Sequence, residues 1–384
     1  MKFFRKKRRH RRIDRKERNR RTLLAVIILV AILGISLYIF ENTKKNVYYG
    51  NYVPPTTNVD NNYTPTNFNS DIVLKLPMKI YGVVGHKINI YFDNVFLTKN
   101  LTNYEIQVDS LIGSQEKNYW TCTPTYEGEF KVKISAFLNS KLVASESTTL
   151  FIKLATAGAG KVRKCLFIGD SITEAGAYTQ ELLKLQAANG LKIQLQGTLG
   201  KYPNLLEGRA GWTLNQFYSD PDSPFVFQRK FDFEKYMRVH NFSGLNYVFI
   251  NLGVNDVFGC SSDYSVNKVT AKYLSDLDEM VKSIHKYSSS IKVAVVITIP
   301  PNSSVAAFKN DYKKQTLTRY TRNNFIFASK LLDFSTSKEA MNIYAVPVNV
   351  NIDTYNGFYN AVHPNESGYK QIGQSIWYWL KSME

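Results

Sequence analysis

Short apolar runs alternate with helix-period stretches over residues 161–384, and this alternation constrains the fold more than any other feature of the chain. The apolar runs are nearly continuous, as buried parallel strands are, and they lie at residues 165–168, 247–252, 293–299 and 343–350. The helix-period stretches lie at residues 174–189, 269–288, 311–332 and 366–381. We therefore predict a three-layer α/β/α domain with a parallel sheet, whose site lies at the carboxyl ends of the strands.

A strongly basic segment precedes a long uncharged run near the start of the chain. Residues 1–21 hold 13 Lys and Arg against two acids, so they carry +11 of the formal net charge of +18. Residues 22–40 contain no charged side chain, and this length is close to the ~20 residues that a helix needs to cross a bilayer. Lys and Arg flank the cytoplasmic side of such spans. We therefore predict a cytoplasmic tail (1–21), a single-pass signal-anchor (22–40) and an extracellular remainder in the cell membrane.

A cleaved signal peptide is the alternative to an uncleaved anchor. The apolar run is longer than the ~7 to 15 residues of a usual signal-peptide core, which favours the anchor. Without the tail the chain carries only +7, so its charge does not indicate a nucleic-acid partner.

The segment between the anchor and the α/β region has two parts. Residues 41–70 are rich in Asn, Thr, Tyr and Pro and are predicted to form an extended linker. Residues 71–154 contain short runs in which apolar and polar residues alternate, which indicates a small β-sandwich of immunoglobulin-like type. This module is either a spacer or a surface that binds a glycan or a partner. The small residues at 155–160 are predicted to form a hinge before the domain at 161–384.

Four polar motifs lie next to predicted strand or helix ends. Gly169-Asp170-Ser171 follows the run at 165–168, and a serine there is exposed near the N–H groups of a helix start. Gly211 lies in a loop after a strand predicted near residues 193–195, where a missing Cβ allows close approach to a ligand. Asn255 follows residues 247–252 and can donate to an oxyanion, and His363 precedes the last helix and supplies a base. Taken singly, Gly169-Asp170-Ser171 is more typical of a helix N-cap, and the Gly211 and Asn255 motifs are each typical of a turn.

In the order Ser171, Gly211, Asn255 and His363, these motifs closely resemble the SGNH hydrolases, the GDSL-like esterase and lipase superfamily, over about residues 164–381. The resemblance implies a flavodoxin-like hydrolase domain. It also implies Ser171 as nucleophile, His363 as general base, and an oxyanion hole formed by the backbone N–H groups of Ser171 and Gly211 with the Asn255 side chain. We predict no cofactor, and no metal because the histidines are isolated.

Asn360 departs from the family pattern, which usually has Asp three residues before the histidine. In a serine-protease triad, exchanging that carboxylate for an amide lowers kcat by roughly 10⁴. Three interpretations follow. Asn360 or a backbone carbonyl can orient His363 in a working dyad, a nearby acid such as Asp353 can substitute, or the enzyme is weakened.

The predicted function is a membrane-anchored extracellular serine esterase that removes acetyl or other small acyl groups from cell-surface carbohydrate. The predicted partners are an acylated carbohydrate or small ester and the membrane, with no nucleic acid. Aromatic residues after Gly211 can stack on sugar rings or simply pack; they are Trp212, Tyr218, Phe225 and Phe227. One alternative is an O-acyltransferase that acts on surface polysaccharide. The other is a glycan-binding protein whose catalysis is weakened.

Overall fold

The computed structural model describes residues 72–312 and 314–384. The predicted cytoplasmic tail, membrane anchor and linker at residues 1–70 lie outside the described residues. Within the described ranges, no helix has both the length and the apolar character needed to cross a bilayer.

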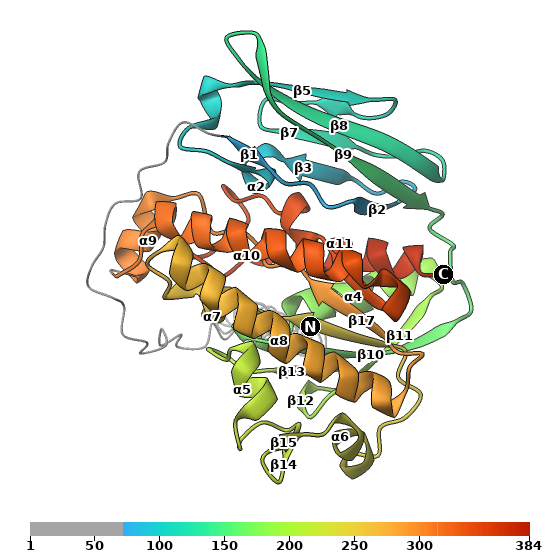
Figure 1. Cartoon of the computed structure of the whole chain (residues 1–384). Coiled ribbons are helices and arrows are strands. Elements are labelled where there is room, and N and C mark those ends of the chain that lie inside the picture. The colour runs from blue at the N-terminus through green and yellow to red at the C-terminus, as the bar shows by residue number, and fades with distance from the viewer. Residues whose placement is uncertain (1–71, 313) are drawn as a thin grey trace, which may run out of the picture. The chain divides into compact units, whose positions relative to one another are not determined.

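A seven-stranded sheet forms the centre of the α/β region (Figure 1). Its strands are β10 (Val162–Gly169), β11 (Lys192–Gln196), β12 (Leu199–Lys201), β13 (Asn204–Gly208), β16 (Tyr247–Asn251), β17 (Lys292–Val296) and β18 (Ile343–Val346). The order is β12-β13-β10-β16-β17-β18, and β11 pairs with the first half of β10. All pairs are parallel except β12 with β13. Every residue of β16 is buried, as the apolar run predicts. The parallel strands alternate with helices along the chain, which confirms the predicted α/β class.

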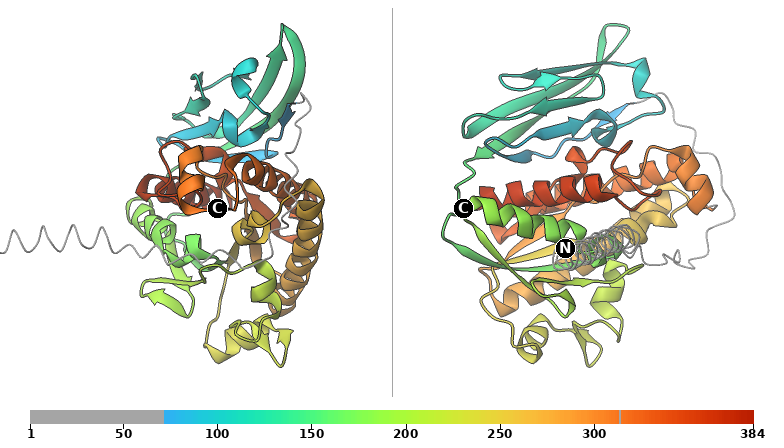
Figure 2. Two further views of the ribbon diagram at one scale, coloured as in Figure 1. Left: turned by 90° about the vertical axis from the view of Figure 1, so that its left-hand side faces the viewer. Right: turned by 180° about the vertical axis from the view of Figure 1, so that it is seen from behind.

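Helices cover both faces of this sheet (Figure 2). They are α3 (Ser171–Glu174), α4 (Ala177–Asn189), α5 (Leu214–Ser219), α6 (Phe233–Val239), α7 (Val254–Phe258), α8 (Asp263–Tyr287), α9 (Val305–Asp311), α10 (Leu317–Ser337) and α11 (Glu366–Ser382). Helix α11 packs against α4, whereas α8 packs against α5, α6, α7 and α10. A short hairpin of β14 (Val226–Phe227) and β15 (Lys230–Phe231) lies between α5 and α6.

Residues 72–153 form β-sheets. One has the order β2 (Lys79–Val83), β9 (Lys141–Lys153), β8 (Gly128–Leu138), β5 (Glu105–Ser110), and another the order β3 (Ile88–Tyr91), β7 (Tyr119–Cys122), β6 (Ser114–Gln115). The pair β1 (Val73–Leu74) and β4 (Phe96–Leu97) flanks the short helix α2 (Phe92–Val95). Along β8, Val132 and Ile134 are buried while Lys131 and Lys133 are exposed, as the alternation indicates. The immunoglobulin-like character of these sheets stays a prediction.

Several element boundaries differ from the sequence prediction. The strand near residues 193–195 exists as β11, but β13 follows it and leads into the Gly211 loop. The helix predicted at 174–189 is interrupted by Gly176, whose φ of +64° is left-handed. The helix predicted at 311–332 begins only at Leu317, because a separate helix, α9, ends at Asp311. The strand predicted at 343–350 ends at Val346 and is followed by a 3₁₀ turn, η3 (Val348–Asn351).

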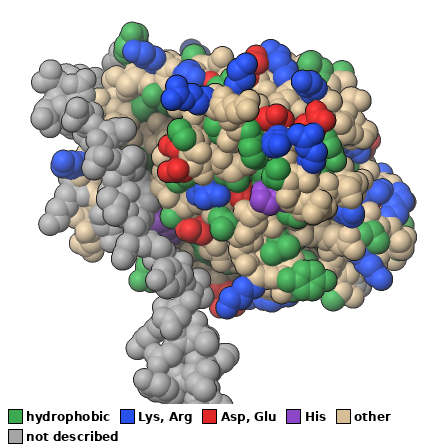
Figure 3. Space-filling model, turned by 90° about the horizontal axis from the view of Figure 1, so that it is seen from below, with side chains coloured by type: hydrophobic (Ala, Val, Ile, Leu, Met, Phe, Trp, Pro, Cys, Tyr) green, Lys and Arg blue, Asp and Glu red, His purple; other side chains and the backbone are tan. Residues whose placement is uncertain are grey.

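The β-sheets of residues 72–153 contact the α/β region through polar bonds and packing. Asn94 Nδ2 donates to the carbonyls of Asn349 (2.8 Å) and Ile352 (2.7 Å), and Lys75 pairs with Asp333. The described residues 72–312 and 314–384 lie in one compact unit, and Lys381 Nζ holds the predicted hinge by donating to the Ala157 carbonyl. On the face seen in Figure 3, Lys and Arg side chains lie among Asp and Glu, in keeping with the small net charge outside residues 1–21.

Candidate active site

Three of the four motifs follow neighbouring strands of the sheet. Strand β10 lies between β13 and β16, and Gly169 at its end is level with Gly208 on one side and Asn251 on the other. The carboxyl ends of parallel strands meet at one edge of a sheet. The residues that follow these three strands, namely Ser171, Gly211 and Asn255, are therefore brought to the same edge.

The turn that carries Ser171 is compact because two glycines allow its backbone to approach its neighbours. A Cβ on Gly169 would lie 2.0 Å from Thr173 Oγ1, and a Cβ on Gly208 would lie 2.2 Å from the Glu174 nitrogen. Asp170 is the N-cap of α3 and accepts a hydrogen bond from the Ile172 N–H at 2.9 Å. Because Asp170 performs the capping, the Ser171 hydroxyl is left for another partner.

That partner is His363. Its Nε2 lies 2.9 Å from Ser171 Oγ, although 192 positions separate the two residues. His363 lies in the turn before α11 and is only 4% exposed. A hydroxyl within hydrogen-bond distance of an imidazole is the arrangement that activates a serine nucleophile.

Asn360 lies beside the other nitrogen of the imidazole. Its Oδ1 accepts from the backbone N–H groups of Val362 (3.0 Å) and His363 (2.8 Å), and these two bonds fix which way the amide points. His363 Nδ1 then lies 3.1 Å from Asn360 Nδ2 and 3.2 Å from Asn360 Oδ1. Asp353 is occupied in its own turn, where it accepts from the N–H groups of Tyr355 and Asn356. The orienting position beside Nδ1 is therefore taken by an amide.

The Gly211 loop is held from both sides. The Arg209 N–H donates to the Gly169 carbonyl at 2.9 Å, and Asn255 Nδ2 donates to the Trp212 carbonyl at 2.9 Å. Gly211 has a left-handed φ of +77°, which favours glycine, and a Cβ there would meet nothing within 4 Å. The Asn255 amide carries a second N–H, so it can hold the loop and still donate to a developing oxyanion.

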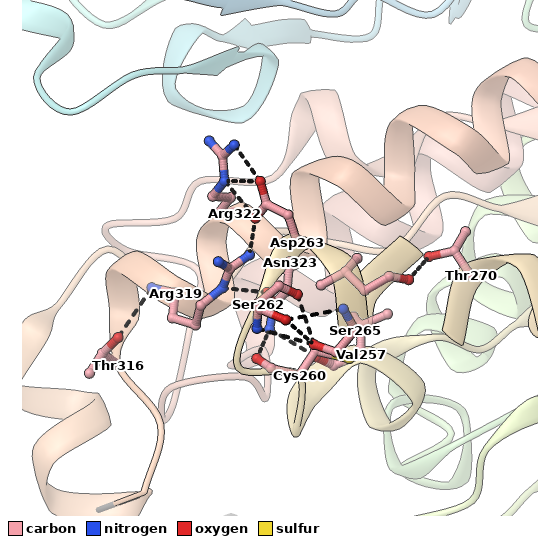
Figure 4. A network of polar contacts seen from close by, with 11 residues as sticks. Val257, Cys260, Ser262, Asp263, Ser265, Thr270, Thr316, Arg319, Arg322 and Asn323 are labelled. Atoms are coloured by element: carbon pink, nitrogen blue, oxygen red, sulfur yellow. Dashed lines mark hydrogen bonds and ion pairs between the residues drawn. The ribbon is translucent and has the colours of Figure 1, made fainter. Parts of the chain in front are cut away.

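A polar network fixes the segment that carries Asn255 (Figure 4). Asn323 of α10 is fully buried, and its Nδ2 donates to the carbonyls of Val257 (3.0 Å) and Cys260 (2.6 Å), just after Asn255. Arg319 Nε donates to Asn323 Oδ1, and the same guanidinium pairs with Asp263 at the start of α8. This network connects α7, α8 and α10 and so limits the movement of Asn255.

Further residues support the site but were not singled out from the sequence. Asn302 Nδ2 donates to the Asn360 carbonyl, and its backbone N–H donates to the Ala361 carbonyl. The sequence does contain a signal for Asn302, because this residue follows the predicted strand at 293–299, as three of the four site motifs follow theirs. Below the Ser171 turn, Thr173 Oγ1 lies 2.8 Å from the Tyr178 hydroxyl. Nothing in the sequence distinguishes this buried pair from ordinary core residues.

Two acids near these motifs have strongly perturbed ionisation. Burial raises the pKa of Asp170 to about 7, and burial likewise raises the pKa of Asp256, which accepts from the Leu214 N–H, to about 7.

Of the aromatic residues after Gly211, Phe225 is fully buried against Tyr236 and therefore packs in the core. Within residues 72–312 and 314–384, no group of three or more His, Cys, Asp or Glu side chains could hold a metal ion.

Comparison with known proteins gives one family match. The model of the GDSL-like Lipase/Acylhydrolase family matches residues 167–371, which is more than half of the chain and includes all five predicted site residues. No curated protein matches the sequence.

Solved structures also resemble this chain. A family 3 carbohydrate esterase from Clostridium thermocellum is 20% identical, with a TM-score of 0.38, and the match covers 56% of this chain and 93% of that chain. A carbohydrate acetylesterase from Sinorhizobium meliloti is 14% identical, with a TM-score of 0.39, covering 58% and 100%. A carbohydrate esterase family 3 protein from Talaromyces cellulolyticus is 16% identical, with a TM-score of 0.38, covering 57% and 96%.

Proposed function

The chain belongs to the GDSL-like lipase/acylhydrolase family of ester-hydrolysing enzymes, and from this premise we propose that it is a serine esterase acting on O-acylated cell-surface carbohydrate. The observation that carries the serine mechanism is the 2.9 Å contact between Ser171 Oγ and His363 Nε2. The carbohydrate substrate is suggested by the predicted extracellular position of the domain.

In the proposed reaction, His363 Nε2 accepts the Ser171 proton as Oγ attacks the ester carbonyl. The negative charge on the carbonyl oxygen is stabilised by the N–H groups of Ser171 and Gly211 and by Asn255 Nδ2. Protonated His363 then gives its proton to the departing alcohol, leaving an acyl-enzyme on Ser171. A water molecule that His363 deprotonates releases the carboxylic acid and restores the serine.

Hydrolysis of p-nitrophenyl acetate by the full chain tests this mechanism. Ser171→Ala should abolish turnover, and His363→Ala should lower kcat by about 10² to 10⁴, because a positioned base contributes that much to the rate. Ser275→Ala, at an exposed position on α8, is the matched control and should behave as wild type. Turnover that survives Ser171→Ala would overturn the assignment of the nucleophile.

The proposed location is the outer side of the cell membrane, held by residues 22–40. It is supported by the basic residues that precede this uncharged run. The full chain should sediment with membranes, resist carbonate extraction, and be digested when protease is added to intact cells. A soluble, protease-protected chain would contradict this location.

A further inference from the structure

A cavity lies where residues 93–102 of the β-sheet region meet the α/β region. It has a volume of about 530 Å³, and its other walls come from Pro300, Pro301, Ser303, Leu317, Thr318, Thr321, Thr354 and Tyr355. This volume falls within the ~300 to 1,000 Å³ of small-molecule sites. Both parts of the chain contribute to the cavity, so neither part can form it alone.

The walls of the cavity are fixed by bonds between the two parts. Asn94, which lines the cavity, is bonded through Nδ2 to the carbonyls of Asn349 and Ile352. The Tyr355 hydroxyl donates to Asp93 Oδ2 at 2.7 Å, while 58% of the Tyr355 surface stays exposed. A ring that is anchored by its hydroxyl and open to solvent is a preformed surface on which an amphipathic ring can stack.

The lining chemistry suits a neutral ligand with many hydroxyl groups. Hydroxyl side chains dominate the polar lining, namely Thr98, Thr102, Ser303, Thr318, Thr321 and Thr354. Asn94 also lines the cavity; it is only 6% exposed, and its buried Oδ1 has no hydrogen-bond partner among the described residues. Asp93 and Lys99 both line the cavity, and this mixed charge does not select an anion or a cation.

One loop separates the cavity from the turn that carries His363. Pro300, Pro301 and Ser303 line the cavity, whereas Asn302 between them donates to the Asn360 carbonyl at 3.1 Å. Ser303 is tied to the opposite wall, because its hydroxyl lies 2.8 Å from that of Thr354. A polymer whose ester lies at Ser171 could therefore reach the cavity with units further along its chain.

We propose that this cavity binds sugar units of a neutral oligosaccharide chain, remote from the ester that is cleaved. The proposal rests on the proposed carbohydrate esterase function for its link to catalysis. It gives the β-sheet region a part in substrate binding that a spacer would not have.

Binding is tested first, by calorimetric titration of the full-length Ser171→Ala protein with xylohexaose, cellohexaose, mannohexaose and chitohexaose. At least one of them should bind saturably. Thr318→Trp, which fills the rim of the cavity, and Tyr355→Ala, which removes the exposed ring, should each weaken that binding by at least about tenfold. Ser275→Trp, on exposed α8 surface, is the matched control and should not change it. Equal thermal unfolding of the variants shows that each is folded.

Kinetics then separate this proposal from the proposed function. With the catalytic serine intact, Thr318→Trp should lower kcat/KM for the O-acetylated form of the bound oligosaccharide at least tenfold more than kcat/KM for p-nitrophenyl acetate. If none of the four oligosaccharides binds, or if neither cavity variant changes the affinity, the cavity proposal is overturned. The proposed esterase function would not be affected by that result. Oligosaccharide binding without hydrolysis of any ester would instead overturn the esterase mechanism.

Discussion

At the scale of single residues, Asn360 can hydrogen-bond to either neutral tautomer of His363, whereas a carboxylate would favour only one. To accept a proton from Ser171, Nε2 must be bare, so the ring proton must sit on Nδ1 and point at Asn360 Oδ1, 3.2 Å away. Asn360 Nδ2 is equally close and would donate to a bare Nδ1, which places the proton on Nε2 and removes the base. The amide therefore stabilises an unproductive tautomer as well as the productive one.

Asn360→Asp should raise kcat for p-nitrophenyl acetate, because a carboxylate accepts from Nδ1–H and from both backbone N–H groups. The gain should be at least about tenfold, with a ceiling near the 10⁴ by which the opposite exchange slows a serine protease. Asp353→Asn is the control and should leave kcat unchanged, since Asp353 bonds within its own turn. An unchanged or lower kcat in Asn360→Asp would mean that the amide already orients the ring.

The burial of Asp170 predicts that the free energy of unfolding falls as pH rises. Burial raises its pKa to about 7 in the folded protein, against about 3.9 in an unfolded chain. The folded state therefore holds more protons between these values, and this acid makes the free energy of unfolding fall as pH rises from about 4 to about 7. Denaturant titrations should show a shallower fall in Asp170→Asn, with a gain of roughly 1 to 4 kcal/mol at pH 7.

Asp263→Asn is the comparison of opposite sign. Hydrogen bonds from Arg322 and Arg319 lower the pKa of Asp263, so its contribution to stability is present above the unfolded pKa and is lost as pH falls through the folded value. This variant should lose stability at pH 7 relative to wild type and lose less of it on acidification. Equal pH slopes in wild type and both variants would contradict the two assignments.

At the scale of elements, the position of α7 depends on Asn323 of α10. Asn323→Ala leaves the buried carbonyls of Val257 and Cys260 without their donor, at about 1 to 3 kcal/mol for each unsatisfied group. Unfolding should become easier by a few kcal/mol, and kcat should fall because Asn255 loses its rigid support. Thr336→Ala, half-buried on the same helix, is the control. A loss of stability with unchanged kcat would show that α7 does not need this clamp.

The elements also show how far local pattern determines the fold. Strands β10, β16 and β17 and helix α11 were predictable because buried parallel strands and an amphipathic helix leave strong periodic signals. Strand β13 was not, since its five residues include Glu207, whose burial depends on a bond from the Tyr236 hydroxyl far along the chain. The site motifs were predictable because each is a short run of neighbouring residues. The geometry of the Asn360 amide was not, because it depends on the folded positions of the surrounding backbone.

At the scale of the whole molecule, residues 72–153 and 161–384 should unfold together. Composition predicts a division at residues 155–160, yet Asn94 and Lys75 bond across this division, and the described residues lie in one compact unit. Calorimetry of the full chain should show one cooperative transition for this unit, with equal calorimetric and van't Hoff enthalpies. Two resolved transitions would mean that the contacts between the parts contribute little.

The separation of Ser171 and His363 by 192 positions has a consequence for biosynthesis. A growing chain presents the serine after the first strand of the α/β region, but it has no base until the sheet has been completed through β18 and the His363 turn has followed. A prematurely terminated product therefore carries the Ser171 hydroxyl without its imidazole partner. We therefore expect ester cleavage to begin only when the whole domain has been assembled.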